Sequence, residues 1–282
     1  MVAQPRTASW GYARWFALAL VLSCASGVDA QTAAPVHAKI SLVAEPTDAQ
    51  VGRVAWIGVF FDLESGWHIY WVNPGDAGEA PDIDWSLPPG VRAGDIRWPV
   101  PARIATGPLV DYGYEGQVLL AVPLQVPTGF QPGALSGVTA DVRYVICREV
   151  CIPAKAHLTW PSPSGTNAPA EIAARRQLFR HARDRWAKPL PAGWAIEASD
   201  NGGQFVLAIQ TGRREPTATF FPQDPDQIEN AALQVVVPAP RGAQLTLQKS
   251  DPQSKPPSVL RGILVLADDR AFDIAAPVTA RR

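Results

Sequence analysis

Short runs of alternating apolar and polar residues recur along the chain from residue 38 onward. Residues 37–43 alternate in part, residues 51–63 are strongly apolar, and residues 67–71 continue this pattern after a Glu-Ser-Gly break. A period of two predicts β-strands, and the Gly and Pro residues between the runs predict turns. Short strands at this spacing predict an antiparallel β-sandwich. Further strands of this sandwich are expected at residues 83–85, 94–98, 117–123, 138–147 and 156–160.

The pattern changes at residues 161–167 (PSPSGTN), where small and polar residues predict a linker. Pro169 suits the first turn of a helix, which we expect to run to about Ala187 and to stop before Pro189. Three apolar residues at seven-residue spacing would share one face of this helix: Ile172, Phe179 and Trp186. Five arginines give it a basic surface, which we interpret as a solvated face: Arg175, Arg176, Arg180, Arg183 and Arg185.

A second β-rich region follows the expected helix. Its strands are expected at residues 204–211, 217–221, 233–237, 245–249, 260–267 and 271–275. The chain is therefore predicted to be mainly β, with two β domains joined by a linking helix. The expected divisions are an export signal at 1–30, a β-sandwich at 31–162, the linker and helix at 163–189, and a smaller β-rich domain at 190–282.

The first thirty residues have the pattern of an export signal. Arg6 and Arg14 supply positive charge, and the eight apolar residues 15–22 are too few to span a bilayer. Cleavage is expected after Ala30, with lipidation of Cys24 as the less favoured alternative. Cleavage after Ala30 would remove Cys24, and lipidation would block its thiol. No later segment approaches the ~18 apolar residues of a membrane span. The mature protein is thus expected in an exported, oxidising compartment, the periplasm.

The composition and net charge argue against several classes of function. The 282 residues are 47% apolar and 18% charged, which is typical of a globular protein of about two domains. A net charge of −1 gives no indication of binding to nucleic acid or to an anionic membrane. The three cysteines are too few for a disulfide-dense scaffold or a four-cysteine zinc site.

With Cys24 set aside, the candidate chemistry rests on Cys147 and Cys151. Residues 144–146 (YVI) favour a strand and Pro153 opposes a helix, so we expect a strand end, a tight loop and a strand start. This arrangement would bring the two sulfurs close enough to pair. Closing so short a ring stabilises a fold by roughly 2 kcal/mol on the chain-entropy model. Short, exposed rings are also the labile, exchange-competent ones.

Two other interpretations of this cysteine pair stay open from the residues alone. The disulfide would be purely structural if the protein were a non-catalytic β-sandwich adaptor. Alternatively, two thiolates with His157 or His68 would suit copper or zinc, although no fourth ligand is visible in the sequence. No resident metal or cofactor is expected.

Four segments occur in a characteristic order: residues 67–78 (WHIYWVNPGDAG), 98–103 (WPVPAR), 111–116 (DYGYEG) and 145–153 (VICREVCIP). Together they resemble the N-terminal periplasmic region of the DsbD/ScsB family of thiol:disulfide interchange proteins. Residues 220–230 (FFPQDPDQIEN) resemble the second β region of longer members of that family.

The resemblance implies an immunoglobulin-like sandwich that acts as a thiol–disulfide oxidoreductase of the protein-disulfide reductase type. Such a protein receives electrons from a membrane thiol donor, here a separate DsbD/CcdA-like protein, and passes them to thioredoxin-like periplasmic proteins. Cys147 and Cys151 would be the redox pair, and Cys151 would form the mixed disulfide with a partner.

The resemblance also implies a cap loop that shields the redox pair. By position this loop would be residues 111–116, with Tyr112 or Tyr114 lying over the sulfurs. Charge near the pair would act in both directions. Arg148 would favour a thiolate, whereas Glu149 would oppose it. Asp111 or Glu115 would oppose it as well if the cap loop closes over the pair.

Overall fold

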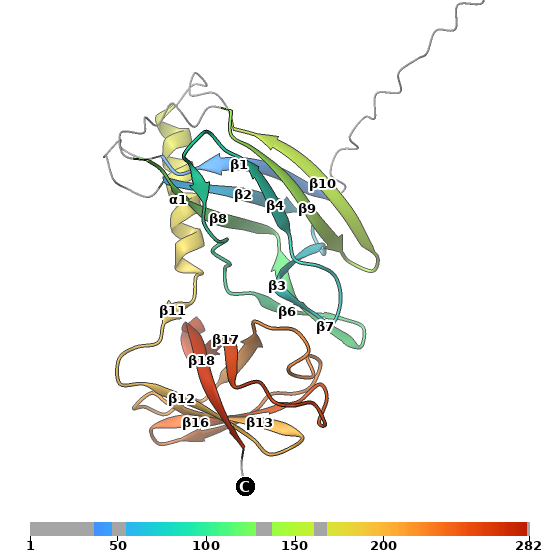
Figure 1. Cartoon of the computed structure of the whole chain (residues 1–282), viewed down its shortest axis with the longest axis vertical. Helices are drawn as coiled ribbons and strands as arrows, with labels where there is room; N and C mark the ends of the chain where they lie inside the picture. Colours follow the sequence, from blue (N-terminus) through green and yellow to red (C-terminus); the bar gives the residue numbers. More distant parts are fainter. Residues whose placement is uncertain (1–36, 47–54, 128–136, 161–167, 281–282) are drawn as a thin grey trace, which may run out of the picture. The chain divides into compact units, whose positions relative to one another are not determined.

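The computed structural model describes residues 37–46, 55–127, 137–160 and 168–280 (Figure 1). The expected signal segment, with Cys24 and Ala30, lies outside the described residues, as does the linker at 161–167. Within the described ranges, no helix is long and apolar enough to cross a membrane.

The first β domain, residues 37–160, contains two antiparallel sheets that form a sandwich of the immunoglobulin-like type expected from the sequence (Figure 1). One sheet has four strands in the order β1 (Ala38–Ala44), β2 (Ala55–Leu63), β8 (Gln117–Gln125) and β5 (Arg92–Ala93). The other has six strands. Its order is β10 (Cys151–Thr159), β9 (Thr139–Cys147), β3 (His68–Gly75), β7 (Leu109–Glu115) and β6 (Ala102–Thr106), and β4 (Asp82–Ser86) also pairs with β9.

Alternation along the strands fills the space between these two sheets. Ile57, Val59 and Phe61 of β2 point inward and are fully buried, as expected where every second residue of a strand faces the core. Ile146 and Tyr144 of β9 belong to the same core cluster, and the ring of Tyr144 packs edge-on against Phe61 at 5.4 Å between centroids. Strand β9, which carries Cys147, is therefore anchored in the core.

The single helix of the described chain, α1 (Pro169–Asp184), covers the outer face of the four-stranded sheet. Phe179 and Ala182 of α1 pack against Leu119 and Ala121 of β8, so that β8 is buried on both faces. The helix begins at Pro169 as predicted and ends before the predicted Ala187.

The arginine-rich surface of α1 is not simply solvated at its end. Arg183 forms an ion pair with Glu45, and its guanidinium lies 5.5 Å from the ring centre of Trp56. Arg185 lies 5.9 Å from the ring centre of Tyr114. These contacts link the end of the helix to the first β domain. They correct the prediction of a solvated face at Arg183, which is partly buried, whereas Arg185 is exposed as predicted.

The second β domain, residues 188–280, is built from eight strands. Along the sheet they are β14 (Ala218–Pro222), β17 (Val259–Leu266), β18 (Ala271–Ala280), β12 (Ala195–Asp200), β13 (Gln204–Gln210), β16 (Gly242–Gln248) and β15 (Val235–Ala239), with β11 (Lys188–Pro189) also paired to β18. A 3-10 turn, Ala267–Asp269, connects β17 to β18. Strand β18 pairs with β17 along most of its length and with β12 at its end, so the sheet folds over a core of its own.

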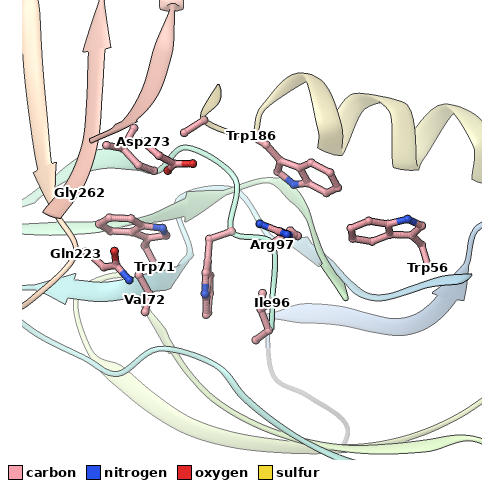
Figure 2. A pocket seen from close by; sticks show the side chains of 12 residues that line it. Trp56, Trp71, Val72, Ile96, Arg97, Trp186, Gln223, Gly262 and Asp273 are labelled. Atoms are coloured by element: carbon pink, nitrogen blue, oxygen red, sulfur yellow. The ribbon is translucent and has the colours of Figure 1, made fainter. Parts of the chain in front are cut away.

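The two β domains contact each other around a cavity of about 480 Å³ (Figure 2). Trp71 of the first domain lines this cavity and packs edge-on against Phe221 of the second, with 6.4 Å between ring centres. Phe221 also packs against Tyr112 at 5.3 Å. The segment after β14 is thereby held close to the end of β3.

Some predicted strands differ from those in the structure. Residues 94–98 are not a strand: only Arg92–Ala93 pair as β5, and Arg97 makes one isolated bridge to Ala121. Strands β6, β7 and β12 were not expected. Gly113 lies within β7, where the backbone approaches β3 so closely that a Cβ atom would lie 2.2 Å from the carbonyl oxygen of Ile69.

Candidate redox site

The two candidate cysteines face each other across a tight hairpin. Strand β9 ends at Cys147, β10 begins at Cys151, and the two residues are register partners joined by a disulfide, with 4.2 Å between their Cα atoms. This confirms the predicted strand, loop and strand. Strand β10 lies at the edge of its sheet, where Pro153 is tolerated because the position demands fewer ladder hydrogen bonds.

The two sulfur-bearing residues differ in exposure. Cys147 is only 2% exposed, whereas Cys151 lies on the surface at the tip of the hairpin. Val150, beside Cys151, is 68% exposed, which is unusual for so large an apolar side chain. A reacting thiol from another molecule can therefore reach Cys151 more readily than Cys147.

Tyr70 of β3 holds the buried side of the disulfide. Its hydroxyl donates a hydrogen bond to Sγ of Cys147 at 2.7 Å and lies 3.4 Å from Sγ of Cys151. Burial raises the pKa of Tyr70 well above the ordinary value for tyrosine, and the charge of Asp111 raises it further. The phenol consequently stays protonated and remains a donor across the physiological pH range.

His68 and Asp111 lie behind Tyr70, and both are only 2% exposed. The backbone of His68 pairs in register with Cys147, which aligns β3 with β9. The side chain of His68 approaches Asp111, with 3.3 Å between Nε2 and Oδ2, and its ring packs edge-on against Tyr70. A carboxylate, an imidazole and a phenol are thus grouped beside the sulfur of Cys147.

The end of β3 and the turn that follows it, residues 73–78 (the 73–78 loop below), cover the ring of Tyr70. Gly78 has a φ of +76°, and a Cβ atom placed on it would lie 2.1–2.6 Å from the ring atoms of Tyr70. Only glycine fits at this position, because it tolerates the left-handed backbone and brings no side chain into the ring. Asp111 fixes the same loop by accepting a hydrogen bond from the backbone N–H of Ala77 at 3.1 Å.

Trp67 and Arg148 flank the exposed side of the pair. The guanidinium of Arg148 lies 5.2 Å from the ring centre of Trp67, a cation–π contact. His37 stacks on the same indole with 3.8 Å between ring centres. Arg148, in the loop that joins the two cysteines, is therefore held against the first β domain.

The structure corrects the expected cap loop. Residues 111–116 do not form a loop over the sulfurs, because residues up to Glu115 belong to β7, which is paired on both sides with β3 and β6. Tyr112 and Tyr114 are buried in the core. The hydroxyl of Tyr112 donates to Oδ1 of Asn230, and that of Tyr114 donates to the carbonyl of Pro99.

Of the four residues expected in the cap loop, Asp111 has a side chain that interacts with the residues grouped beside Cys147, through His68 and through its electrostatic effect on Tyr70. Glu115 is exposed and is the register partner of His68 on β7. Sequence reasoning missed Tyr70. The signal available for it was its place in the 67–78 segment, which carried part of the family resemblance.

The described residues contain no group of three or more His, Cys, Asp and Glu side chains arranged to hold a metal ion. His157, a candidate ligand, instead pairs with Asp141 on the neighbouring strand at 2.7 Å. His68, the other candidate, is directed to Asp111.

Residues 41–163 match the family model described as "Thiol:disulfide interchange protein DsbD, N-terminal". The N-terminal periplasmic domain of ScsB from Proteus mirabilis has a similar structure, with a TM-score of 0.64 and 16% sequence identity. That alignment covers 86% of this chain and 94% of the ScsB chain, and shows a shared fold. The periplasmic chaperone SfaE aligns with a TM-score of 0.20 and 12% identity over 86% of this chain and 100% of its own. No curated protein is similar enough in sequence to match.

The family match and the disulfide between Cys147 and Cys151 point to the same chemistry. Together they support a role in thiol–disulfide interchange. The similarity to the DsbD N-terminal family thus extends over residues 41–163, which include both cysteines.

Proposed function

We propose that this protein relays reducing equivalents between exported proteins through Cys147 and Cys151. The observation that carries the proposal is the asymmetry of the disulfide. Cys151 is exposed to an attacking thiol, whereas Cys147 is buried and its sulfur accepts a hydrogen bond from Tyr70. A purely structural disulfide has no need for one accessible sulfur and one sulfur beside a buried donor.

Reduction of the pair begins with a thiolate of the electron donor. This thiolate attacks Sγ of Cys151, forms a mixed disulfide and breaks the bond to Cys147, which departs as a thiolate. The hydroxyl of Tyr70 donates to that departing sulfur and stabilises its negative charge. A second thiolate of the donor then attacks the donor's own sulfur in the mixed disulfide and releases Cys151, leaving the donor oxidised and this protein reduced.

The reduced protein then passes its electrons to an oxidised target by the same exchange reaction. The thiolate of Cys151 attacks the target's disulfide and releases one target sulfur as a thiolate. The thiolate of Cys147 next attacks Sγ of Cys151, which re-forms the disulfide seen in the structure and releases the second target sulfur. Two electrons pass to the target, and protons from solvent complete its two thiols.

The surface around Cys151 is suited to a protein partner. Val150 offers an exposed apolar contact beside the reactive sulfur. We assign the target role to thioredoxin-like periplasmic proteins and the donor role to a membrane thiol carrier of the DsbD/CcdA type. The periplasm is the compartment that fits both roles, and processing after Ala30 belongs to the same proposal.

The proposal is tested with purified full-length protein and a thioredoxin-like protein as the partner. Oxidised protein mixed with the reduced partner is expected to gain two thiols as the partner loses two. With reduced Cys147→Ser and the oxidised partner, the thiolate of Cys151 should open the partner's disulfide and the reaction should stop at a mixed disulfide through Cys151, which mass spectrometry identifies by its linked peptides. An absence of electron transfer in both directions, with the disulfide still reducible by small thiols, would reject the relay and favour the structural role.

A further inference from the structure

We propose that Asn230, in the second β domain, is a positioning residue for the redox pair and acts on it through the 73–78 loop and Tyr70. The inference rests on the proposed thiol–disulfide exchange at Cys147 and Cys151. It assigns to the second domain a part in that exchange, although the domain contributes no atom to the disulfide itself.

Asn230 connects the two β domains through both polar atoms of its side-chain amide. Its Nδ2 donates to Oδ1 of Asp76 at 2.8 Å, and its Oδ1 accepts from the hydroxyl of Tyr112 at 2.9 Å. Its backbone carbonyl also accepts a hydrogen bond from Arg103. Asn230 is only 8% exposed, so these hydrogen bonds are largely protected from competing water.

A second contact from the same domain reaches the start of the loop. Nδ2 of Asn73 donates to the carbonyls of Pro222 and Asp224, at 2.8 and 3.3 Å. Oδ1 of Asn73 accepts from the backbone N–H of Gly75 and so shapes the loop itself. Because Asn73 is 1% exposed, losing these partners would leave a buried amide unsatisfied.

The first β domain holds the other side of the loop. Oδ2 of Asp76 accepts from the backbone N–H of Val110 at 2.7 Å, and Oδ1 of Asp111 accepts from that of Ala77. The carboxylate of Asp76 is thus shared between β7 and Asn230. Removing the second-domain contacts would leave the loop anchored on one side alone.

Through the contact between Gly78 and Tyr70, the position of the 73–78 loop affects the reactivity of the Cys147 sulfur. The Cβ position of Gly78 lies closer to the ring of Tyr70 than a side chain could occupy, so the backbone of Gly78 rests directly on the ring. A loop held in place therefore confines the ring, and the confined ring presents its hydroxyl to Cys147. A loosened loop would give Tyr70 room to withdraw from that sulfur.

The test uses the full-length protein with Asn230→Asp, which is nearly isosteric. The variant keeps an oxygen to accept from Tyr112 but turns the group facing Asp76 from a donor into a second carboxylate oxygen. We expect the rate of disulfide reduction by glutathione to fall on the order of fivefold, in line with the loss of a hydrogen bond of ordinary strength. The matched control is Asn201→Asp, an exposed asparagine in the same domain, which should leave the rate unchanged.

Combination with Tyr70→Phe decides whether the effect passes through Tyr70. If it does, Asn230→Asp produces no further decrease in a protein that already lacks the phenol, so the double variant reacts at the rate of Tyr70→Phe alone. Decreases that multiply would overturn the proposal. An unchanged rate in the single variant would overturn it as well.

Asn73→Asp provides an independent route if Asn230→Asp fails to fold. It keeps Oδ1 for Gly75 but replaces the donor to Pro222 and Asp224, and the same loss of rate is expected. Glutathione is the reductant, so the result is independent of any protein partner. If the proposed relay is wrong, the wild-type protein still reacts with glutathione but transfers no electrons to or from a thioredoxin-like protein.

Discussion

The hydroxyl of Tyr70 donates to the sulfur of Cys147 at 2.7 Å, and these two residues are 77 positions apart in the chain. This contact joins β3 to the end of β9 at the one place where the backbones of the two strands pair, His68 with Cys147. It gives the buried cysteine a donor while the other cysteine stays accessible. The following predictions depend on this arrangement.

Removing the phenol should make Cys147 a poorer leaving group. Tyr70→Phe keeps the ring beneath Gly78 but removes the donor. A hydrogen bond to a charged acceptor contributes about 1.5–3 kcal/mol, so the pKa of the Cys147 thiol should rise by about one unit or more. Reduction of the disulfide by glutathione should slow roughly tenfold, since thiols of higher pKa leave more slowly. Thiolate absorbance against pH and stopped-flow kinetics measure the two effects.

Tyr144→Phe is the matched control for this substitution. Tyr144 is buried in the same sandwich, but its hydroxyl has no hydrogen-bond partner within the described residues. Its removal should leave both the thiol pKa and the rate unchanged. Equal effects of the two substitutions would mean that the hydroxyl of Tyr70 has no specific role at the sulfur.

A methyl group on Gly78 should disturb both stability and the redox pair. Gly78→Ala would place a Cβ within 2.6 Å of the ring of Tyr70 at a positive φ. We expect the free energy of unfolding to fall by more than about 2 kcal/mol, from backbone strain together with the clash. Gly116→Ala has a similar φ of +63° with nothing within 4 Å of the added methyl, so it should cost only about 1 kcal/mol. Chemical denaturation measures the free energy of unfolding of both variants. Equal losses would show that the contact with the ring of Tyr70 adds nothing to the cost.

The two cysteines should react at very different rates when separated. In reduced Cys147→Ser the remaining thiol is the exposed Cys151, whereas in reduced Cys151→Ser it is the buried Cys147. We expect Cys151 to react with a small aromatic disulfide at least about tenfold faster, because access limits exchange. Absorbance of the released thiol follows the reaction. A faster reaction at Cys147 would reverse the proposed order of attack.

Acid should destabilise the second β domain through Glu215. Burial raises the pKa of Glu215, but hydrogen bonds from Thr211, Arg270 and Arg213 outweigh burial, so the pKa lies below the ordinary value of 4.5. Its carboxylate therefore adds stability at pH above the unfolded-state pKa, and this stability is lost as the pH falls through the folded-state value.

Glu215→Gln tests this interpretation. At neutral pH the free energy of unfolding should fall by about 2 kcal/mol, since charge-assisted hydrogen bonds to a buried group are lost. The difference between the wild type and the variant should then shrink as the pH falls below the ordinary value of 4.5 and through the lower folded-state pKa, because the wild-type carboxylate becomes protonated. Denaturation curves across the acid range measure it. A difference that is constant with pH would assign the loss to packing instead.

The hairpin that carries the cysteines was predictable because its determinants are local. Tyr144, Val145 and Ile146 favour a strand, and the loop between the cysteines is too short for anything but a reversal. The start of α1 at Pro169 is local in the same sense. Element type can be predicted where neighbouring residues decide it.

Tyr70 was not predictable as the residue beside the sulfurs, because its position depends on which strand pairs with β9. Residues 67–78 and 111–116 both carry tyrosines, and the sequence does not say which segment lies at the cysteines. The two-residue spacing of Tyr112 and Tyr114 puts both on one face of β7, and that face is in the core. A long-range register, not a local pattern, decides between the segments.

The contact made by Asn230 was likewise beyond local reasoning. In sequence, residues 220–230 stood out only through their resemblance to the second β region of longer family members. Its significance arises only where that domain meets the loop after β3 and the asparagine side chain bridges Asp76 and Tyr112. Polar side chains at domain contacts have no periodic signature.

The reduction potential of the Cys147–Cys151 pair tests the central claim most directly. It is measured on the full-length protein by equilibration with glutathione redox buffers and mass spectrometric counting of free thiols. Disulfides that serve only structure have potentials below about −300 mV. The proposed relay predicts a value above about −300 mV, within reach of thioredoxin-like partners. A value below that limit would contradict the account and leave the disulfide as a structural bond.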